Sequence, residues 1–251
     1  MNKIIVFVLA IMFVNLIFGF QPKTQFNSYK SKNFLIKYER SISSPAVKSI
    51  ASDLELQFKE WTKRLNLTPN KLPVEVRIYK TEKKYIQESQ STLKEEGTYS
   101  NGIIFLSAPS KLDEKGMRVN IVSRVVALSI LSAANDNGCP RWLSEAYGIY
   151  AGGDLEKYGT PTILRAISFL DFQQEINQAK REKDLVYLYS KLSQVMKFLV
   201  DRYGKQKVDS IFIGFDGIKT VEQVFEETLS EKYDKIEMAW NEAVKNRKSK
   251  R

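Results

Sequence analysis

The sequence contains no histidine and only one cysteine among its 251 residues. Without histidine, the chain cannot build a Ser-His-Asp triad, a histidine general base or a zinc site made of imidazoles. With Cys139 as its only cysteine, it cannot form an intrachain disulfide, and we expect this side chain to be a buried small residue. The sequence also lacks glycine-rich phosphate loops, Cys-x-x-Cys pairs, calcium-loop motifs, internal repeats and low-complexity linkers. These absences exclude many of the common catalytic and cofactor-binding classes.

The composition is that of a globular protein with a basic surface. Hydrophobic residues make up 43% of the chain, so a packed core is expected. The 39 basic and 29 acidic residues give a formal net charge of +10. We interpret this charge first as a solvated surface, and second as a weak attraction to an anionic membrane surface or envelope polymer. The sequence carries no nucleic-acid-binding motif, so nucleic acid is not an expected partner.

The first 20 residues have the pattern of a targeting segment. Lys3 supplies a positive charge, and Ile4–Phe20 is a run of 17 residues in which only Asn15 and Gly19 are not apolar. This length predicts a cleaved signal peptide over residues 1–20, with an uncleaved N-terminal anchor as the alternative. The protein is therefore expected to be exported, in a periplasmic, secreted or membrane-anchored form.

Hydrophobic periodicity predicts an α+β protein with two lobes. The first lobe, residues 21–110, has mixed strand and helix order, and the second, residues 111–244, is mainly helical with an irregular stretch before residue 185. A basic tail, 245–251, is expected to be frayed. The predicted strands are 33–39, 74–79 and 102–107, and the predicted helices are 43–65, 82–88, 115–134, 140–151, 185–203, 208–215, 220–229 and 231–244.

The most specific pattern is the string Pro140-Arg141-Trp142-Leu143-Ser144-Glu145, which follows the predicted apolar helix 115–134. This region resembles the active-site region of gluzincin-type zinc peptidases of the peptidase MA-like family. There, a helix carrying H-E-x-x-H is followed by a helix that opens with Pro-x-Trp-Leu-x-Glu. Downstream, Tyr189-Ser190, Tyr203-Gly204 and Glu237–Trp240 are similar to the tail of the same family. The resemblance implies a zincin-like fold.

The catalytic half of the family pattern is missing. Ser123, Arg124 and Ala127 occupy the first imidazole, the base and the second imidazole positions of H-E-x-x-H. The resemblance implies that Glu145, 18 residues after Ala127, corresponds to the third zinc ligand, and that Ile149 replaces a second acidic residue. Histidines at i and i+4 share one helix face and hold zinc there, which serine and alanine cannot do. Arginine in the base position cannot accept a proton, so no metal and no cofactor are expected.

These replacements favour a catalytically inactive metallopeptidase-like protein of the cell envelope. Its former substrate cleft would bind a peptide or an envelope protein, with Arg124, Trp142, Glu145 and Tyr189 as candidate cleft residues. In working zincins an edge strand of the first lobe pairs with an extended substrate, and residues 102–107 are the candidate for that strand.

Two alternatives remain open at the level of sequence. One is an active hydrolase with an unrecognised site, such as a Ser–Lys dyad or a carboxylate pair of Glu145 with Asp154 or Glu156. The other is an unrelated α+β fold, in which the helix 115–134 and Trp142 simply belong to the core.

Two contacts follow from the resemblance. The helix that carries residues 123–127 should pack beside the helix that carries Glu145. We also predict that Arg124 forms an ion pair with Glu145 in place of the metal, because an unpaired buried carboxylate is costly and a guanidinium matches it geometrically. The alternative is that Arg124 faces solvent and Glu145 is hydrogen-bonded by backbone or tyrosine groups, such as Tyr189.

Overall fold

The computed structural model describes residues 25–90, 95–134, 138–155, 168–179 and 182–248. The predicted signal peptide, residues 1–20, lies outside the described residues, as does Glu156. Within the described ranges, no helix combines the length and the apolar character that spanning a bilayer requires.

The first part of the chain forms a five-stranded mixed sheet, which together with the many helices confirms the α+β class. The strand order is β1-β2-β3-β5-β4. Strands β2, β3 and β5 are parallel, and β1 and β4 pair antiparallel at the two edges. The bounds of the strands are β1 Phe26–Lys30, β2 Phe34–Glu39, β3 Val74–Ile78, β4 Gly97–Ser100 and β5 Ile103–Leu106.

The edge strand differs from the predicted one. The segment 102–107 contains β5, which lies between β3 and β4 and is therefore an internal strand. The edge on that side is β4, with the sequence GTYS. Sequence periodicity missed β4 because four mostly polar residues show no apolar alternation. It missed β1 (FNSYK) for a similar reason, since this edge strand buries none of its residues fully.

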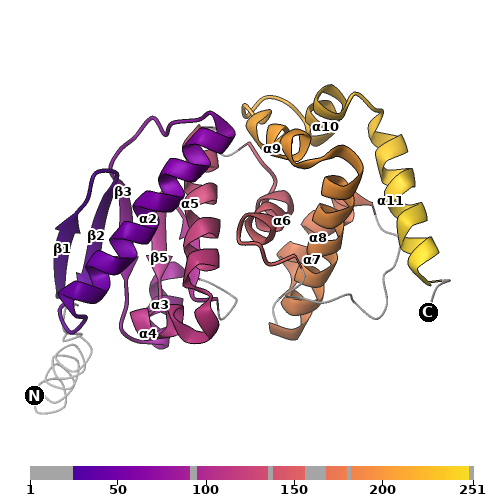
Figure 1. Ribbon diagram of the computed structural model, residues 1–251. Coiled ribbons are helices and arrows are strands. Elements are labelled where there is room, and N and C mark those ends of the chain that lie inside the picture. The colour runs from indigo at the N-terminus through magenta and orange to yellow at the C-terminus, as the bar shows by residue number, and fades with distance from the viewer. Residues whose placement is uncertain (1–24, 91–94, 135–137, 156–167, 180–181, 249–251) are drawn as a thin grey trace, which may run out of the picture.

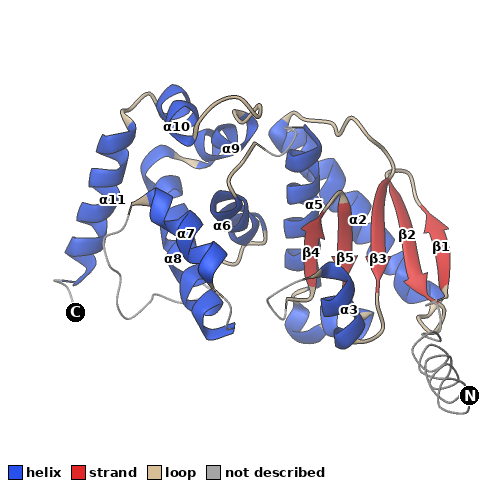
Figure 2. Cartoon of the chain, turned by 180° about the vertical axis from the view of Figure 1, so that it is seen from behind, coloured by secondary structure: helices blue, strands red, loops and turns tan. Residues whose placement is uncertain are grey.

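Two helices cover one face of the sheet and a third covers the other (Figures 1 and 2). Helices α2 (Ser44–Leu65) and α5 (Arg118–Ala134) pack against each other, and α5 also contacts β4 and β5. On the opposite face, α3 (Glu82–Ser89) packs on β5 over a small cluster formed by Tyr79, Tyr85 and Phe105. A short helix, α4 (Pro109–Leu112), and a 3₁₀ turn, Glu114–Gly116, lead into α5.

The second part of the chain is helical in its described ranges. Helix α6 packs between α5 and α8, which confirms the predicted contact between the two helices of the family pattern. Helix α7 falls in the stretch that was expected to be irregular, and α11 continues four residues beyond the predicted end at Val244. The bounds are α6 Arg141–Ala151, α7 Phe169–Gln178, α8 Glu182–Tyr203, α9 Lys205–Ile213, α10 Val221–Leu229 and α11 Tyr233–Lys248.

A polar network joins the sheet layer to the helical layer. The guanidinium of Arg64, at the end of α2, donates to both carboxylate oxygens of Asp209 on α9, at 2.8 Å and 3.0 Å. The hydroxyl of Tyr147 on α6 donates to the same carboxylate at 3.0 Å. Arg64 also lies over the ring of Trp61, 4.5 Å from its centroid. Three helices from the two layers therefore meet at one carboxylate.

Candidate functional site

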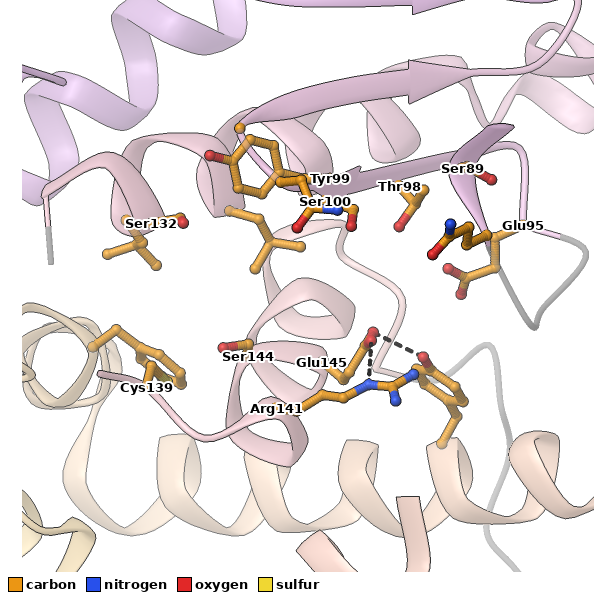
Figure 3. Close-up of a pocket in the computed structure, with 17 residues that line it drawn as sticks. Ser89, Glu95, Thr98, Tyr99, Ser100, Ser132, Cys139, Arg141, Ser144 and Glu145 are labelled. Carbon is orange, nitrogen blue, oxygen red and sulfur yellow. Dashed lines mark hydrogen bonds and ion pairs between the residues drawn. The ribbon is translucent and has the colours of Figure 1, made fainter. Parts of the chain in front are cut away.

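A cavity of about 770 Å³ lies between the sheet edge and the helical layer. One wall is β4, which supplies Thr98 and Tyr99, and the facing wall is α6, which supplies Glu145 (Figure 3). Helix α5 contributes Leu128 and Leu131. The cavity therefore lies where the edge strand, the α5 helix and the Glu145 helix come together.

Gly97 brings the edge strand close to α5. A Cβ atom at this position would lie 2.6 Å from Cγ2 of Ile121 and 3.1 Å from a methyl group of Leu106. A distance below 3 Å requires the neighbour to move, so only glycine lets β4 approach the helix this closely. Glycine at residue 97 therefore allows β4, which forms one wall of the cavity, to lie close to α5.

Glu145 is held mainly by a tyrosine. Its Oε2 accepts a hydrogen bond from the hydroxyl of Tyr189 on α8 at 2.8 Å, and its Oε1 lies 3.8 Å from Nε of Arg141. Burial raises the pKa of Glu145, the negative charge of Glu95 adds to the rise, and the Tyr189 hydrogen bond opposes it. Burial and the Glu145 charge likewise raise the pKa of Tyr189 well above its ordinary value, so this hydroxyl stays protonated and donates.

Arg124 has partners other than the predicted one. Its Nη1 donates to Oε1 of Glu95 at 2.8 Å, and its Nη2 donates to the backbone carbonyl of Gly97 at 2.6 Å. The predicted Arg124–Glu145 ion pair is therefore replaced by an Arg124–Glu95 pair. The alternative is wrong for Arg124, which is 6% exposed and does not face solvent, but right for Glu145, which accepts a hydrogen bond from Tyr189. The charge of Arg124 still lowers the pKa of Glu145 electrostatically.

The side chain of Ser123 meets both α2 and the end of α6. Its hydroxyl accepts a hydrogen bond from the indole of Trp61 on α2 at 2.9 Å and donates to the carbonyl of Ala151, the last residue of α6, at 2.8 Å. Ala127, one turn later, is fully buried. A Cβ at Gly148 of α6 would instead meet the side chains of Arg124 and Leu128, each at 3.3 Å. Arg124 and Leu128 thus hold the i, i+4 positions that face α6.

These residues do not fit a zinc ion. At Gly148, α5 presents a guanidinium, which has no lone pair to give, and an alkyl side chain to α6, and the Ser123 hydroxyl already bonds Trp61 and Ala151. Among the described residues, no group of three or more Cys, Asp or Glu side chains is placed to hold a metal. The one carboxylate at the third-ligand position is engaged by tyrosine and arginine instead.

Two other predicted site residues belong to the core. Trp142 is 1% exposed and stacks against Phe169 and Phe172 of α7, so it supports the helix from behind and is not a cleft residue. Ile149 is buried as well, at 1% exposure. Glu145 and Tyr189, in contrast, both line the cavity.

Cys139 lies at the end of the cavity away from Glu95 (Figure 3). Burial raises the pKa of its thiol to about 12. A thiol with such a pKa stays protonated near neutral pH and is a poor nucleophile. Cys139 therefore acts as an apolar wall of the cavity.

Sequence reasoning missed Glu95, Arg141 and Leu128 as site residues. The i, i+4 spacing of Arg141 and Glu145 on a predicted helix was a usable signal, because such pairs face each other. Leu128, four residues after Arg124, had the same spacing. Glu95 had no local signal, since its place depends on how the short edge strand lies against α5.

Comparisons with protein-family models and with curated proteins find no match to this chain.

Proposed function

We propose that the protein is a catalytically inactive relative of gluzincin-type peptidases that binds an extended peptide segment in the cavity between β4 and α6. The observation that carries this proposal is the edge strand along the cavity wall, opposite the helix of Glu145. The Pro140–Glu145 string, the packing of α5 beside α6, and the sheet edge next to α5 are all consistent with a zincin-like arrangement.

The direction in which each β4 residue points its backbone N–H and C=O groups supports pairing with a peptide. Ser107 N donates to Glu96 O across the β4–β5 pair, at 2.9 Å. In an antiparallel pair, alternate residues turn their backbone groups to the neighbouring strand. Gly97 and Tyr99 therefore turn theirs away from β5. The Gly97 carbonyl accepts from Arg124, which leaves Tyr99 as the residue whose N–H and C=O can pair with an added strand.

Loss of catalysis is part of the proposal. The base position has no proton acceptor, the ligand positions have no imidazole, and the thiol in the cavity stays protonated. The cavity offers hydrogen-bonding groups to a ligand, but no nucleophile that the described residues activate. Binding without turnover is the function that this combination supports best.

The test is a binding screen on the chain from residue 21 to 251. A library of fluorescein-labelled extended hexapeptides should yield ligands that saturate in fluorescence anisotropy. Replacing Tyr99 by Pro removes one N–H at the sheet edge, and Tyr99→Ala is the matched control that removes only the side chain. We expect Tyr99→Pro to weaken binding at least about tenfold more than Tyr99→Ala. Chelator-sensitive cleavage of a peptide, or stoichiometric bound zinc, would overturn the proposal.

We further propose that the mature protein acts outside the cytoplasm, where an envelope protein or peptide is its partner. The support is the pattern of Lys3 and the Ile4–Phe20 run, together with the net charge of +10, which favours anionic surfaces. Fractionation of the native host tests this location. Recovery of the full chain, with Met1, in the cytoplasmic fraction would contradict it.

A further inference from the structure

The cavity has an unequal distribution of charge. Two carboxylates line it, Glu95 and Glu145, and Arg141 is the one basic side chain among its described lining residues. Arg141 is half exposed and its Nε approaches Glu145 only to 3.8 Å, so water screens this pair. Arg124 lies behind the wall, where it donates to Glu95 and to the edge strand. Arg124 therefore compensates the charge of Glu95, and Glu145 is the lining carboxylate whose charge is only partly compensated.

Glu145 retains acceptor capacity toward the cavity. Its Oε2 takes the Tyr189 hydroxyl, and an ionised carboxylate has about four lone-pair sites in all. Its side chain is 30% exposed, although it stands on a helix packed between two others. Tyr189 is 4% exposed and fixes the carboxylate in place from the side of α8. The carboxylate is thus oriented by the protein and open to a donor from a ligand.

A cation is the ligand group that matches this arrangement. Hydrogen bonds between ionised donors and carboxylates are shorter and stronger than neutral ones. A ligand that excludes water from the cavity also removes the screening of Glu145 and strengthens its attraction to a positive charge. A neutral ligand would instead bury a carboxylate that Arg141 only partly compensates.

We propose, on the basis of the peptide-binding function, that the cavity selects a ligand with a Lys or Arg side chain, which Glu145 binds. A peptide paired with Tyr99 on β4 runs along this wall, and alternate side chains share one face, so one of them reaches the Glu145 end. The lining of the cavity also includes the apolar side chains Leu128, Leu131 and Phe212, which can accept an uncharged neighbour of the basic residue.

The experiment compares four peptides that share one sequence found in the library screen. They carry Lys, Arg, norleucine or Glu at one position, and all are N-acetylated and C-amidated, so no terminal ammonium competes for Glu145. Norleucine is a stringent control because it keeps the alkyl chain of lysine, which the apolar walls can also bind. We expect the Lys and Arg peptides to bind at least about tenfold more tightly than the norleucine peptide, and the Glu peptide to bind most weakly.

Two variants assign the preference to Glu145. In Glu145→Gln, which preserves shape, the Lys peptide should lose its advantage, while the norleucine peptide should bind at least as tightly as before, because it no longer buries a carboxylate. The matched control is Glu231→Gln, which removes another carboxylate that accepts from a tyrosine, but outside the cavity. This variant should keep the preference.

The outcomes separate the two proposals. Equal affinity for the Lys and norleucine peptides in the unmodified protein would overturn the charge preference and leave peptide binding intact. A preference that persists in Glu145→Gln would overturn the role of Glu145. A chain that binds none of the library peptides would overturn the peptide-binding function itself, and the inference with it.

Discussion

The hydroxyl of Tyr189 donates to Oε2 of Glu145 at 2.8 Å, and this bond joins the helix of the family-like string to the long helix α8. Under the proposed relationship to zinc peptidases, a metal would face this carboxylate in a working relative. Here a neutral donor holds it, while burial and Glu95 disfavour its charge. The carboxylate is thus kept in position without a dication.

Removing the tyrosine hydroxyl should change the titration of this carboxylate. In Tyr189→Phe, the pKa of Glu145 should rise further, because the lost hydrogen bond stabilised the ionised form. A ¹³C carboxyl NMR titration measures this pKa. The control is Tyr203→Phe, which removes a similar bond to Glu231 at 2.7 Å and should raise the pKa of Glu231 alone. An unchanged Glu145 titration would show that the Tyr189 hydrogen bond does not stabilise the ionised form.

Glu145 should make stability depend on pH in a defined direction. Its pKa in the folded state is raised above the ordinary 4.5, so the folded protein binds this proton more tightly than the unfolded chain. Its favourable contribution is fully present below the unfolded-state pKa and is lost as the pH rises through the folded-state pKa. Glu145→Gln should therefore be more stable than the unmodified protein at neutral pH, with the difference shrinking toward pH 4.

Urea unfolding at several pH values between about 4 and 8 measures this difference. Glu231→Gln provides a control of opposite sign, because the hydrogen bond from Tyr203 lowers the pKa of Glu231. The contribution of Glu231 is present above its unfolded-state pKa and is lost as the pH falls. Equal pH profiles for the two variants would contradict the assignment.

The Arg124–Glu95 pair should be energetically coupled. Arg124→Met removes two donors from a buried region, and breaking such a pair costs roughly 3–5 kcal/mol. A double-mutant cycle with Glu95→Gln should give a coupling of about 0.5–3 kcal/mol, as residues in one ion pair do. The parallel cycle with Glu145→Gln should give a smaller coupling. A larger value for Glu145 would mean that the direct pair, which the sequence predicted, forms in solution.

Gly97 should be intolerant of a side chain. Gly97→Ala places a Cβ against Ile121 at 2.6 Å, and overpacking of this kind costs about 1–3 kcal/mol. The double variant Gly97→Ala/Ile121→Ala removes the clashing atom, so its loss of stability should be smaller than the sum of the single losses. Thermal and urea unfolding of the three variants test this. Simple additivity would mean that the clash with Ile121 is not the source of the Gly97→Ala loss.

Local pattern was sufficient to predict much of the fold. The buried strands and the long helices have strong periodicity, so α2, α5, α6 and α8 were predicted close to their observed bounds. The polar edge strands were missed because their formation depends on pairing with a neighbour and not on their own apolar pattern. The segment 102–107 was expected to be the edge strand for the same reason: because β4 was missed, nothing in the prediction stood outside β5.

The site was predictable only in part. Glu145 and Tyr189 were found because they belong to motifs with fixed spacing. The partner of Arg124 was not, because Glu95 reaches it through the tertiary approach of β4 to α5. Trp142 was placed on the wrong side of its helix: the string alone does not say which face of α6 meets α7. The sequence motifs therefore identified which side chains belong to the site, but not which residues these side chains contact in the folded protein.

The carboxylate of Asp209 has a consequence for how the cavity receives a ligand. Arg64 and Tyr147 bind this carboxylate from α2 and α6, so they join the sheet layer to the helical layer. The ring of Tyr147 also packs on that of Phe212, which lines the cavity, with 4.0 Å between the ring centroids. Walls that are joined in this way change little on association, and the free-energy cost of ordering them is met during folding. If the cavity binds a ligand as proposed, its walls are preorganised, and it would discriminate between ligands by fit more than by closing around them.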